Sequence, residues 1–281
     1  MVEEGPKLLT PSDVKSLARR YGIRPSQALG QNFVVDPNTI RRVVRLAEVA
    51  ASDRVVEVGA GLGTLTLGLS AAASDVIAIE LDRRLIPALR EVLADRSNVR
   101  LVEGDAMSVD YPGLLGSNPH RFISNLPYNI APPLIATLLD QAPSISDFVV
   151  MVQREVGERL AARPGSKSYG GITVLVAYHC RATILGKVPP TVFWPAPKVE
   201  SLLIRLERRA PEVKVESAEL MPVVRAAFGQ RRKTVRNALI AGLGQSAERV
   251  EEALRRAGVA PGARAESLSL EEFALIVEAL R

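Results

Sequence analysis

The chain has 281 residues, of which 47% are hydrophobic, and a formal net charge of +5, so it can form one large domain, or a large and a small one, around an apolar core. One cysteine excludes an intramolecular disulfide framework, two histidines disfavour a zinc site, and no apolar run reaches the ~20 residues that a membrane span requires. The N-terminus carries Glu3 and Glu4 in place of the apolar stretch of a secretory signal, so we expect a cytoplasmic protein. From the small number of cysteines and histidines we also expect that it binds no metal.

Short apolar strands alternate with helices in the first half of the chain. Strand, helix and strand in this order imply right-handed crossovers and a mostly parallel sheet with helices on both faces. Ligands of such sheets bind beyond the carboxyl ends of the strands, near the point where the strand order reverses. The predicted strands are residues 53–58, 75–79, 99–102, 121–124 and 148–152. The predicted helices are residues 64–73, 84–94, 130–139 and 153–162.

The pattern changes after residue 187. The proline-rich segment that follows predicts an extended connection and then a late strand up to about residue 206. Beyond it the pattern is helical to the end of the chain. We therefore predict a first domain of residues 1–208, with an N-terminal arm over 1–26, and a small all-α domain of residues 209–281.

The loop after the first predicted strand carries three alternating glycines, Gly59, Gly61 and Gly63. Glycines at this position let a ligand approach the backbone, and the helix that follows offers free N–H groups. The G-x-G-x-G spacing differs from the G-x-G-x-x-G fingerprint of dinucleotide-binding sites. Taken by itself, the loop is as compatible with a structural turn as with a ligand site.

Acidic residues end the next two predicted strands. Glu80 follows Gly59 by 21 residues and can accept both hydroxyl groups of a ribose, and Asp105 can accept a hydrogen bond from an adenine amino group. The structural alternatives are an exposed strand-end acid for Glu80 and a helix N-cap or Asx-turn for Asp105. Together with the glycine loop, the two acids favour an adenosyl pocket. The lack of a triphosphate loop or dinucleotide spacing then points to S-adenosylmethionine as the cofactor.

The segment Asn125-Leu126-Pro127-Tyr128 stands at the end of the fourth predicted strand. The nitrogen of an exocyclic ring amine is a poor nucleophile because its lone pair is delocalised into the ring. The amide oxygen of Asn125 and the carbonyl of Leu126 can accept both N–H bonds of such an amine and draw the nitrogen toward tetrahedral geometry. Pro127 holds the turn, and Tyr128 offers a ring on which a base can stack, so we expect its ring to matter and not its hydroxyl. These four residues are the predicted catalytic site.

Five segments of the chain resemble the ribosomal RNA adenine dimethyltransferases. The last two segments are similar to the small-subunit, KsgA-type branch of that family, and the resemblance extends from about residue 27 to the end. Two departures, Ala60 where proline is frequent and Ser124 where glycine or alanine is usual, remove no functional group. The segments are Leu29–Phe33, Asn125–Asn129, Pro190–Ser201, Ala227–Asn237 and Arg264–Ser269.

The resemblance implies a Rossmann-like class I methyltransferase fold that uses S-adenosylmethionine. It also implies the target, which is a pair of adjacent adenosines in the 3′-terminal hairpin loop of small-subunit rRNA, each dimethylated during assembly of a pre-ribosomal small subunit. We further expect a monomer that does not bind a membrane. The implied cofactor contacts are Asn32, Val34, Gly59, Glu80, Asp105 and Asn125, and the glycine loop adds Gly61.

Residues 221–247 contain no acidic residue. Cations without acidic neighbours favour contacts with nucleic-acid phosphates, although a solvated helix face is the structural alternative. The predicted RNA-binding residues are Arg225, Arg231, Arg232, Lys233 and Arg236.

Three other functions stay open. A DNA or large-subunit rRNA adenine methyltransferase would share the adenosyl pocket and differ in the small domain. A non-catalytic ribosome-assembly factor could retain the fold as a binding module, although intact Glu80, Asp105 and Asn125–Tyr128 argue against it. A NAD-dependent oxidoreductase is disfavoured by the glycine spacing.

Overall fold

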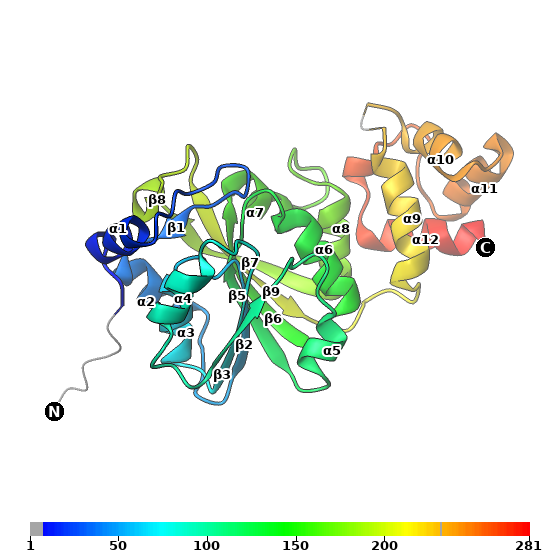
Figure 1. Cartoon of the computed structure of the whole chain (residues 1–281). Coiled ribbons are helices and arrows are strands. Elements are labelled where there is room, and N and C mark those ends of the chain that lie inside the picture. Colours follow the sequence, from blue (N-terminus) through cyan, green and yellow to red (C-terminus); the bar gives the residue numbers. More distant parts are fainter. Residues whose placement is uncertain (1–7, 231) are drawn as a thin grey trace. The chain divides into compact units, whose positions relative to one another are not determined.

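The computed structural model describes residues 8–230 and 232–281 (Figure 1). Its contacts divide the chain into two compact units. The first comprises the chain up to Gly157 together with Thr183–Glu207, and the second comprises Glu158–Ala182 and Arg208–Arg281. The second unit thus includes residues 158–182, which precede the boundary near residue 208 that the sequence suggests. Within the described ranges, no helix has the length and hydropathy needed to cross a membrane.

A seven-stranded sheet has the strand order β4-β3-β2-β5-β6-β9-β7. Strands β2 to β6 pair in parallel, and β9 lies antiparallel to β6. The predicted mostly parallel α/β sheet is therefore confirmed. The strands are β2 Arg54–Val58, β3 Asp75–Glu80, β4 Val99–Glu103, β5 His120–Asn125, β6 Ile145–Gln153, β7 Cys180–Val188 and β9 Ser201–Arg208.

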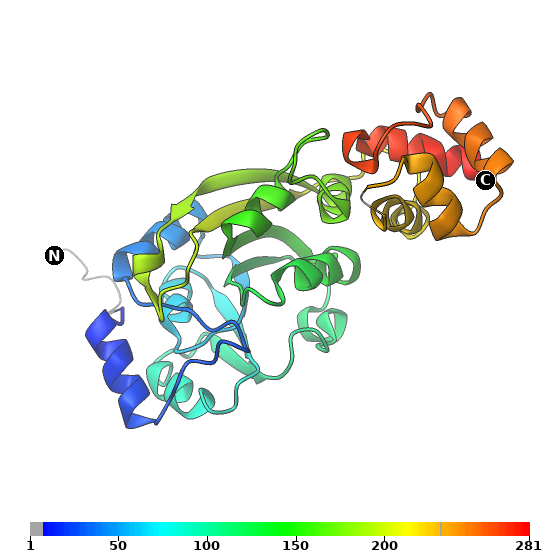
Figure 2. The ribbon, with the colours of Figure 1, turned by 90° about the horizontal axis from the view of Figure 1, so that it is seen from above.

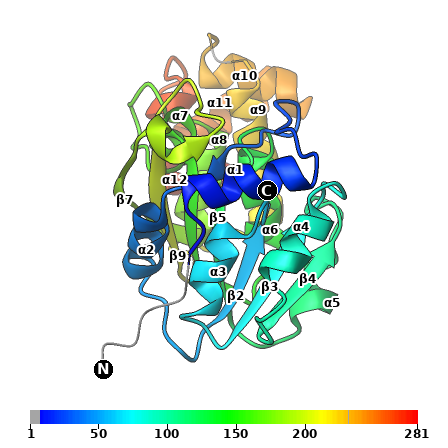
Figure 3. The same cartoon turned by 60° about the vertical axis from the view of Figure 1, so that its left-hand side comes forward.

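Alternate residues of each strand face opposite sides of the sheet. On one side, Val55 and Ile123 pack in an apolar cluster with Leu65 of α3, and Figure 3 shows α3 and α4 in front of β2 and β3. On the other side, the rings of Phe122 and Phe148 lie 5.7 Å apart between centroids. The helices that accompany these strands are α2 Pro37–Leu46, α3 Thr64–Ser70, α4 Ile86–Val92, α5 Tyr111–Leu115, α6 Ala131–Gln141 and α7 Arg154–Leu160.

The chain ahead of α2 forms structure that the sequence patterns did not suggest. Helix α1, Pro11–Arg20, begins with a capping box at Thr10. Strand β1, Phe33–Val34, pairs antiparallel with β8, Phe193–Trp194, which follows the short helix η1, Pro190–Val192. Strands of two residues show no periodicity, so the β1–β8 pair could not be predicted. The segment between α1 and β1, blue in Figures 1 and 2, runs over the end of the sheet where the parallel strands finish.

Strand β7 was also missed by the sequence patterns. It is the last strand in the sheet order. Its exposed residues include both Arg181 and Ile184, so no clean alternation of polar and apolar residues marks it as a strand.

The strand order reverses between β2 and β5. The chain passes from β2 outward to β3 and β4, and β5 then lies on the other side of β2. Val55 pairs with Arg121 across this point. The glycine loop after β2 and the Asn125–Tyr128 segment at the end of β5 therefore leave the sheet as neighbours, at the edge where ligands of such sheets bind.

Most of the second unit is helical, and of its described residues only 180–182 and Arg208 belong to strands. Thr234 caps α10 by accepting the N–H of Asn237, and Ser269 caps α12. Helices α9 and α10 approach closely, because a Cβ on Gly242 would lie only 2.6 Å from the Cβ of Ala226. The helices are α8 Gly171–His179, α9 Ser217–Phe228, α10 Val235–Leu243, α11 Ala247–Arg256, η2 Ala265–Ser267 and α12 Leu270–Leu280.

Candidate functional site

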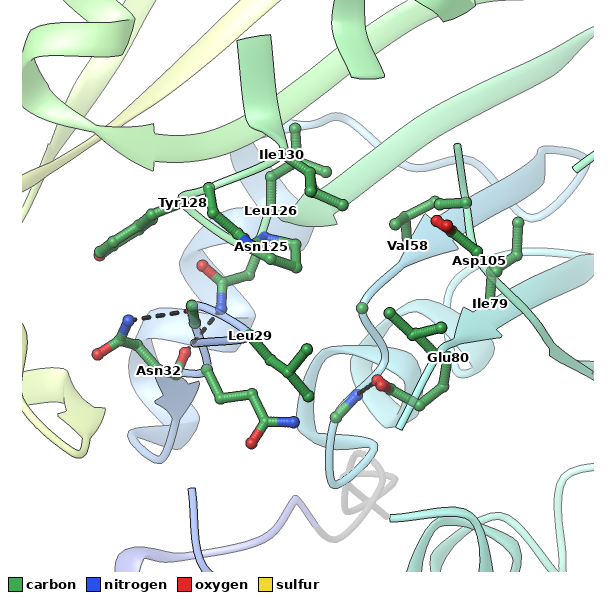
Figure 4. Close-up of a pocket in the computed structure, with 18 of the residues that line it drawn as sticks. Leu29, Asn32, Val58, Ile79, Glu80, Asp105, Asn125, Leu126, Tyr128 and Ile130 are labelled. Atoms are coloured by element: carbon green, nitrogen blue, oxygen red, sulfur yellow. Dashed lines mark hydrogen bonds between the residues drawn. The ribbon is translucent and has the colours of Figure 1, made fainter. Parts of the chain in front are cut away.

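A pocket lies beyond the carboxyl ends of β2, β3, β4 and β5 (Figure 4). The segment between α1 and β1 lines it as well, through Leu29–Asn32, together with Phe33 of β1. The pocket brings together nine predicted site residues from distant parts of the chain. They are Asn32, Gly59, Gly61, Glu80, Asp105, Asn125, Leu126, Pro127 and Tyr128.

The glycine loop has no room for side chains at two of its positions. Gly59 has φ of 74°, and a Cβ there would lie 3.1 Å from the ring of Pro127. Gly61 has φ of 61°, and a Cβ there would lie 2.8 Å from the ring of Phe33. L-residues with side chains rarely adopt such angles, so both positions require glycine. The loop can therefore offer its backbone to a ligand at close range.

Glu80 is only 6% exposed at the end of β3. Its carboxylate accepts the N–H of Gly61 at 2.7 Å and the N–H of Asp82 at 2.9 Å. Burial raises the pKa of Glu80, and these N–H groups oppose the rise. The exposed strand-end reading is wrong, because the side chain is buried and ties the glycine loop to β3. A carboxylate has about four acceptor positions, so capacity for ribose hydroxyls is left.

Asp105 lies in the pocket lining after β4 and is exposed. Its Oδ1 accepts the N–H of Met107 at 2.9 Å, so the Asx-turn alternative is present in the structure. The turn uses Oδ1, so the other carboxylate oxygen, Oδ2, is available. A contact between Oδ2 and an adenine amino group stays a prediction.

The amide of Asn125 is oriented by the backbone of Asn32. Nδ2 of Asn125 donates to the main-chain oxygen of Asn32 at 3.0 Å (Figure 4). A carbonyl oxygen can only accept, so the amide nitrogen must face it and Oδ1 must point elsewhere. Among the described residues, Oδ1 of Asn125 is buried and has no hydrogen-bond partner. A buried acceptor without a partner costs about 1–3 kcal/mol, which a ligand N–H donor would recover.

Tyr128 lies half-buried at the same pocket. Its hydroxyl lies 2.7 Å from the hydroxyl of Ser201 in β9. Burial raises the pKa of Tyr128, and the Ser201 hydrogen bond opposes the rise. The sequence singled out the Pro190–Ser201 segment without a role for Ser201, and only the folded chain brings the two hydroxyls together.

Val34 differs from the other predicted cofactor contacts. It pairs with Phe193 in the small sheet, and its side chain belongs to the apolar core. It does not line the pocket, so its contact with a cofactor stays a prediction.

Gln31 and Asp82 were missed by sequence reasoning. Gln31 lines the pocket, and its side-chain amide lies 2.9 Å from the Asp82 carboxylate. Their positions 51 residues apart offered no local pattern.

The cations predicted to bind RNA fall into two groups in the second unit. Arg225, Arg232 and Lys233 are exposed, and none of them forms an ion pair within the described part of the chain. Arg236 is instead paired with Glu251 at 2.5 Å. Arg231 lies outside the described residues.

Comparisons with known proteins show the family to which the chain is similar. The family model described as ribosomal RNA adenine dimethylase matches residues 24–281. The ribosomal RNA small subunit methyltransferase A of Moorella thermoacetica is 47% identical over 97% of this chain and 98% of its own. The protein of the same name from Streptomyces avermitilis is 49% identical, covering 96% and 93% of the two chains. The crystal structure of 23S rRNA methyltransferase ErmE is 30% identical, covers 89% of this chain and 99% of that one, and gives a TM-score of 0.66.

Proposed function

The chain belongs to the ribosomal RNA adenine dimethylase family, and we propose that it dimethylates the 6-amino groups of two adjacent adenosines in the 3′-terminal hairpin loop of small-subunit rRNA. The methyl donor of this family is S-adenosylmethionine. The relatives that are 47% and 49% identical are named for the small subunit and align over nearly their whole length. They favour the small subunit over the large one as the substrate.

The lining of the pocket fits S-adenosylmethionine. Gly59 and Gly61 keep space that any Cβ would fill, and Glu80 presents a buried carboxylate suited to ribose hydroxyls. When bound, the cofactor supplies an electrophilic methyl group. Loss of the Glu80 carboxylate should weaken cofactor binding.

The observation that carries the proposal is the buried Oδ1 of Asn125, which has no hydrogen-bond partner in the part of the chain that the structure describes. An adenine 6-amino group placed in the pocket would donate one N–H to this oxygen. The hydrogen bond strengthens as positive charge develops on the nitrogen, so it stabilises the transition state more than the ground state. A nitrogen that has gained a methyl group then loses its N–H proton to water, because a methylated arylammonium is strongly acidic.

The base must leave its stack before its amino group can enter the pocket. Unstacking costs a few kcal/mol, and stacking on the ring of Tyr128 would offset about 1–3 kcal/mol of this. After the first transfer one N–H remains, so Asn125 can act in the same way on the monomethylated amine.

In the second unit, the exposed Arg225, Arg232 and Lys233 are suited to rRNA phosphates. Such contacts give affinity and position the enzyme without reading sequence. A pre-ribosomal small subunit as the substrate particle, a monomeric enzyme and a cytoplasmic location stay predictions.

The test is primer extension on rRNA treated with the purified chain and S-adenosylmethionine. Two methyl groups on one adenine nitrogen remove its pairing donors and stop reverse transcriptase. When small-subunit rRNA that starts out unmethylated is treated in this way, we expect stops at two adjacent adenines. Large-subunit rRNA treated in parallel should give no stops. Stops in the large-subunit rRNA alone would establish the resistance-type activity, and no stop in either would favour the non-catalytic assembly factor.

A further inference from the structure

Ser201 is fully buried, with 0% of its surface exposed, and stands at the first position of β9. Its hydroxyl lies 2.7 Å from that of Tyr128, 73 residues earlier in the chain. A Ser hydroxyl at an apolar strand position needs a partner, because an unpaired buried hydroxyl is unfavourable. The Tyr128 hydroxyl is that partner.

Contacts with β6 and α7 fix the place of Ser201 in the sheet. Ser201 pairs with Gln153 of β6. The preceding residue, Glu200, accepts the N–H of Arg154 with its main-chain oxygen at 2.9 Å and contacts the Arg154 side chain with its carboxylate at 3.4 Å. The hydroxyl that meets Tyr128 therefore projects from a strand whose start is held to β6 and α7 by this pairing and these contacts.

The same strand also places Asn125. Met151 of β6 pairs with Asn125, and its carbonyl accepts the N–H of Leu126 at 3.1 Å. Residues 151 and 153 are two positions apart, so they face the same side of the sheet. Strand β6 thus sets the spacing between the amide that meets the target amine and the anchor of the Tyr128 ring.

The anchor restrains one torsion of Tyr128 in particular. The phenolic oxygen lies on the axis of rotation about the Cβ–Cγ bond, so that rotation leaves the hydrogen bond intact. Rotation about the Cα–Cβ bond swings the whole ring and breaks it. A hydrogen bond at the far end of the ring therefore holds the ring at one place beside the pocket.

We propose that Ser201 is a positioning residue, which holds the ring of Tyr128 where it can receive the target adenine. This inference rests on the proposed function. It changes the expectation from the sequence that only the ring of Tyr128 matters, because the hydroxyl becomes the point by which the ring is held. The final serine of the Pro190–Ser201 segment thereby gains a role in the reaction.

The test is a double-mutant cycle of Ser201→Ala and Tyr128→Phe, read as the single-turnover rate of methylation at saturating S-adenosylmethionine. Loss of one hydrogen bond should lower the rate roughly 3–10-fold in either single variant. If Ser201 acts through the Tyr128 hydroxyl, the double variant should be no slower than the slower single variant. If the fold reduction in the double variant equals the product of the two single reductions, the proposal is overturned. It is also overturned if Ser201→Ala methylates as fast as the unaltered chain.

Two further measurements separate positioning from a general structural effect. Ser70→Ala removes another buried hydroxyl, which donates to the carbonyl of Leu67 within α3, and it should leave the rate unchanged. A fluorescent base analogue at the target position reports stacking, and Ser201→Ala should reduce its quenching while the Kd for S-adenosylmethionine stays the same. An altered Kd with unchanged quenching would refute the positioning role.

The outcomes also distinguish this inference from the proposed function. An unaltered chain that leaves small-subunit rRNA unmethylated contradicts the proposed function itself. An active chain in which Tyr128→Ala is strongly impaired, but Ser201→Ala and Tyr128→Phe are not, keeps the proposed function and removes the role of Ser201.

Discussion

The side-chain amide of Gln31 donates a hydrogen bond to Oδ2 of Asp82 at 2.9 Å, which ties the segment before β1 to the residue two positions past Glu80. The Oε1 atom of Gln31 accepts the N–H of Ser26 at 2.7 Å, so both ends of the amide are engaged. Asp82 also donates its own N–H to Glu80. A continuous set of hydrogen bonds therefore connects the segment over the pocket with the predicted ribose acid.

Gln31→Leu should weaken S-adenosylmethionine binding roughly 3–10-fold, the scale of one lost hydrogen bond, because the segment would no longer be held over the pocket. Calorimetry of the purified chain measures this directly. Gln31→Glu should weaken binding further, since a carboxylate would then face Asp82.

The control for this prediction is Arg84→Gln. The Arg84 guanidinium and, to a smaller extent, the Gln31 amide lower the pKa of Asp82 to about 2, but Arg84 is 60% exposed, and solvent screens its pair with Asp82. Its loss should change cofactor affinity little. Equal losses in Arg84→Gln and Gln31→Leu would show that any partner of the Asp82 carboxylate matters equally and that the attachment of the segment has no special role.

Asn125→Ala should lower single-turnover methylation by roughly 10²–10³, the scale for one transition-state hydrogen bond. Binding of the rRNA should be nearly unchanged, because phosphate contacts dominate affinity. Saturating cofactor should not restore the rate. The matched control is Asn38→Ala, since Asn38 is exposed, does not line the pocket, and accepts a hydrogen bond from the Arg41 side chain at 3.2 Å. A similar loss in both variants would contradict the assignment of Asn125.

Glu57 supplies a prediction about pH. It is 1% exposed, accepts a hydrogen bond from Thr66 at 2.6 Å, and burial raises its pKa from 4.5 to about 8. The folded chain therefore keeps a proton that the unfolded chain releases near pH 4.5. The stability contributed by this group is fully present below pH 4.5 and is lost as the pH rises toward 8, by up to about 1.4 kcal/mol per pH unit.

Glu57→Gln should make the decline smaller, because an amide does not titrate and its oxygen can still accept from Thr66, whereas Glu80, whose pKa burial also raises, keeps its own part. Urea unfolding at about pH 5 and about pH 9 measures the difference in the free energy of unfolding. The exposed Asp95 offers a control, since Asp95→Asn should leave the decline in place. An identical decline in Glu57→Gln would mean that another group causes it.

Replacing Arg225, Arg232 and Lys233 together by alanine should weaken binding to the small subunit and reduce the salt slope. Each phosphate contact contributes about 0.7–0.9 to the slope of log K against log salt, so the slope should fall by roughly 2–3. Arg236→Ala should have less effect, because Glu251 already neutralises that cation. An unchanged slope in the triple variant would mean that these cations do not contact phosphates and form a solvated helix face.

Local patterns in the sequence were sufficient to predict the parallel sheet and the edge of the sheet at which the pocket lies. Strands with continuous apolar residues, each ending in a polar residue such as Glu80 or Asn125, can be recognised from a few neighbouring positions. The glycines of the loop are likewise determined locally, because their positive φ angles admit no other residue readily. Strands β1 and β8 could not be predicted, because a strand of two residues is too short to show an alternation of polar and apolar residues.

The working geometry of the site depends on contacts between distant positions, which only the tertiary structure decides. The amide of Asn125 is oriented by Asn32, 93 residues earlier, and the ring of Tyr128 is held by Ser201, 73 residues later. The same holds for charge, since Arg236 is neutralised by a glutamate on the next helix while Arg232 and Lys233 are not. The residue types in a sequence determine which chemistry is available. Which donor meets which acceptor, and which acceptor is left for a ligand, depends on the register of strands and the packing of helices, because hydrogen bonds require atoms within about 3 Å of one another.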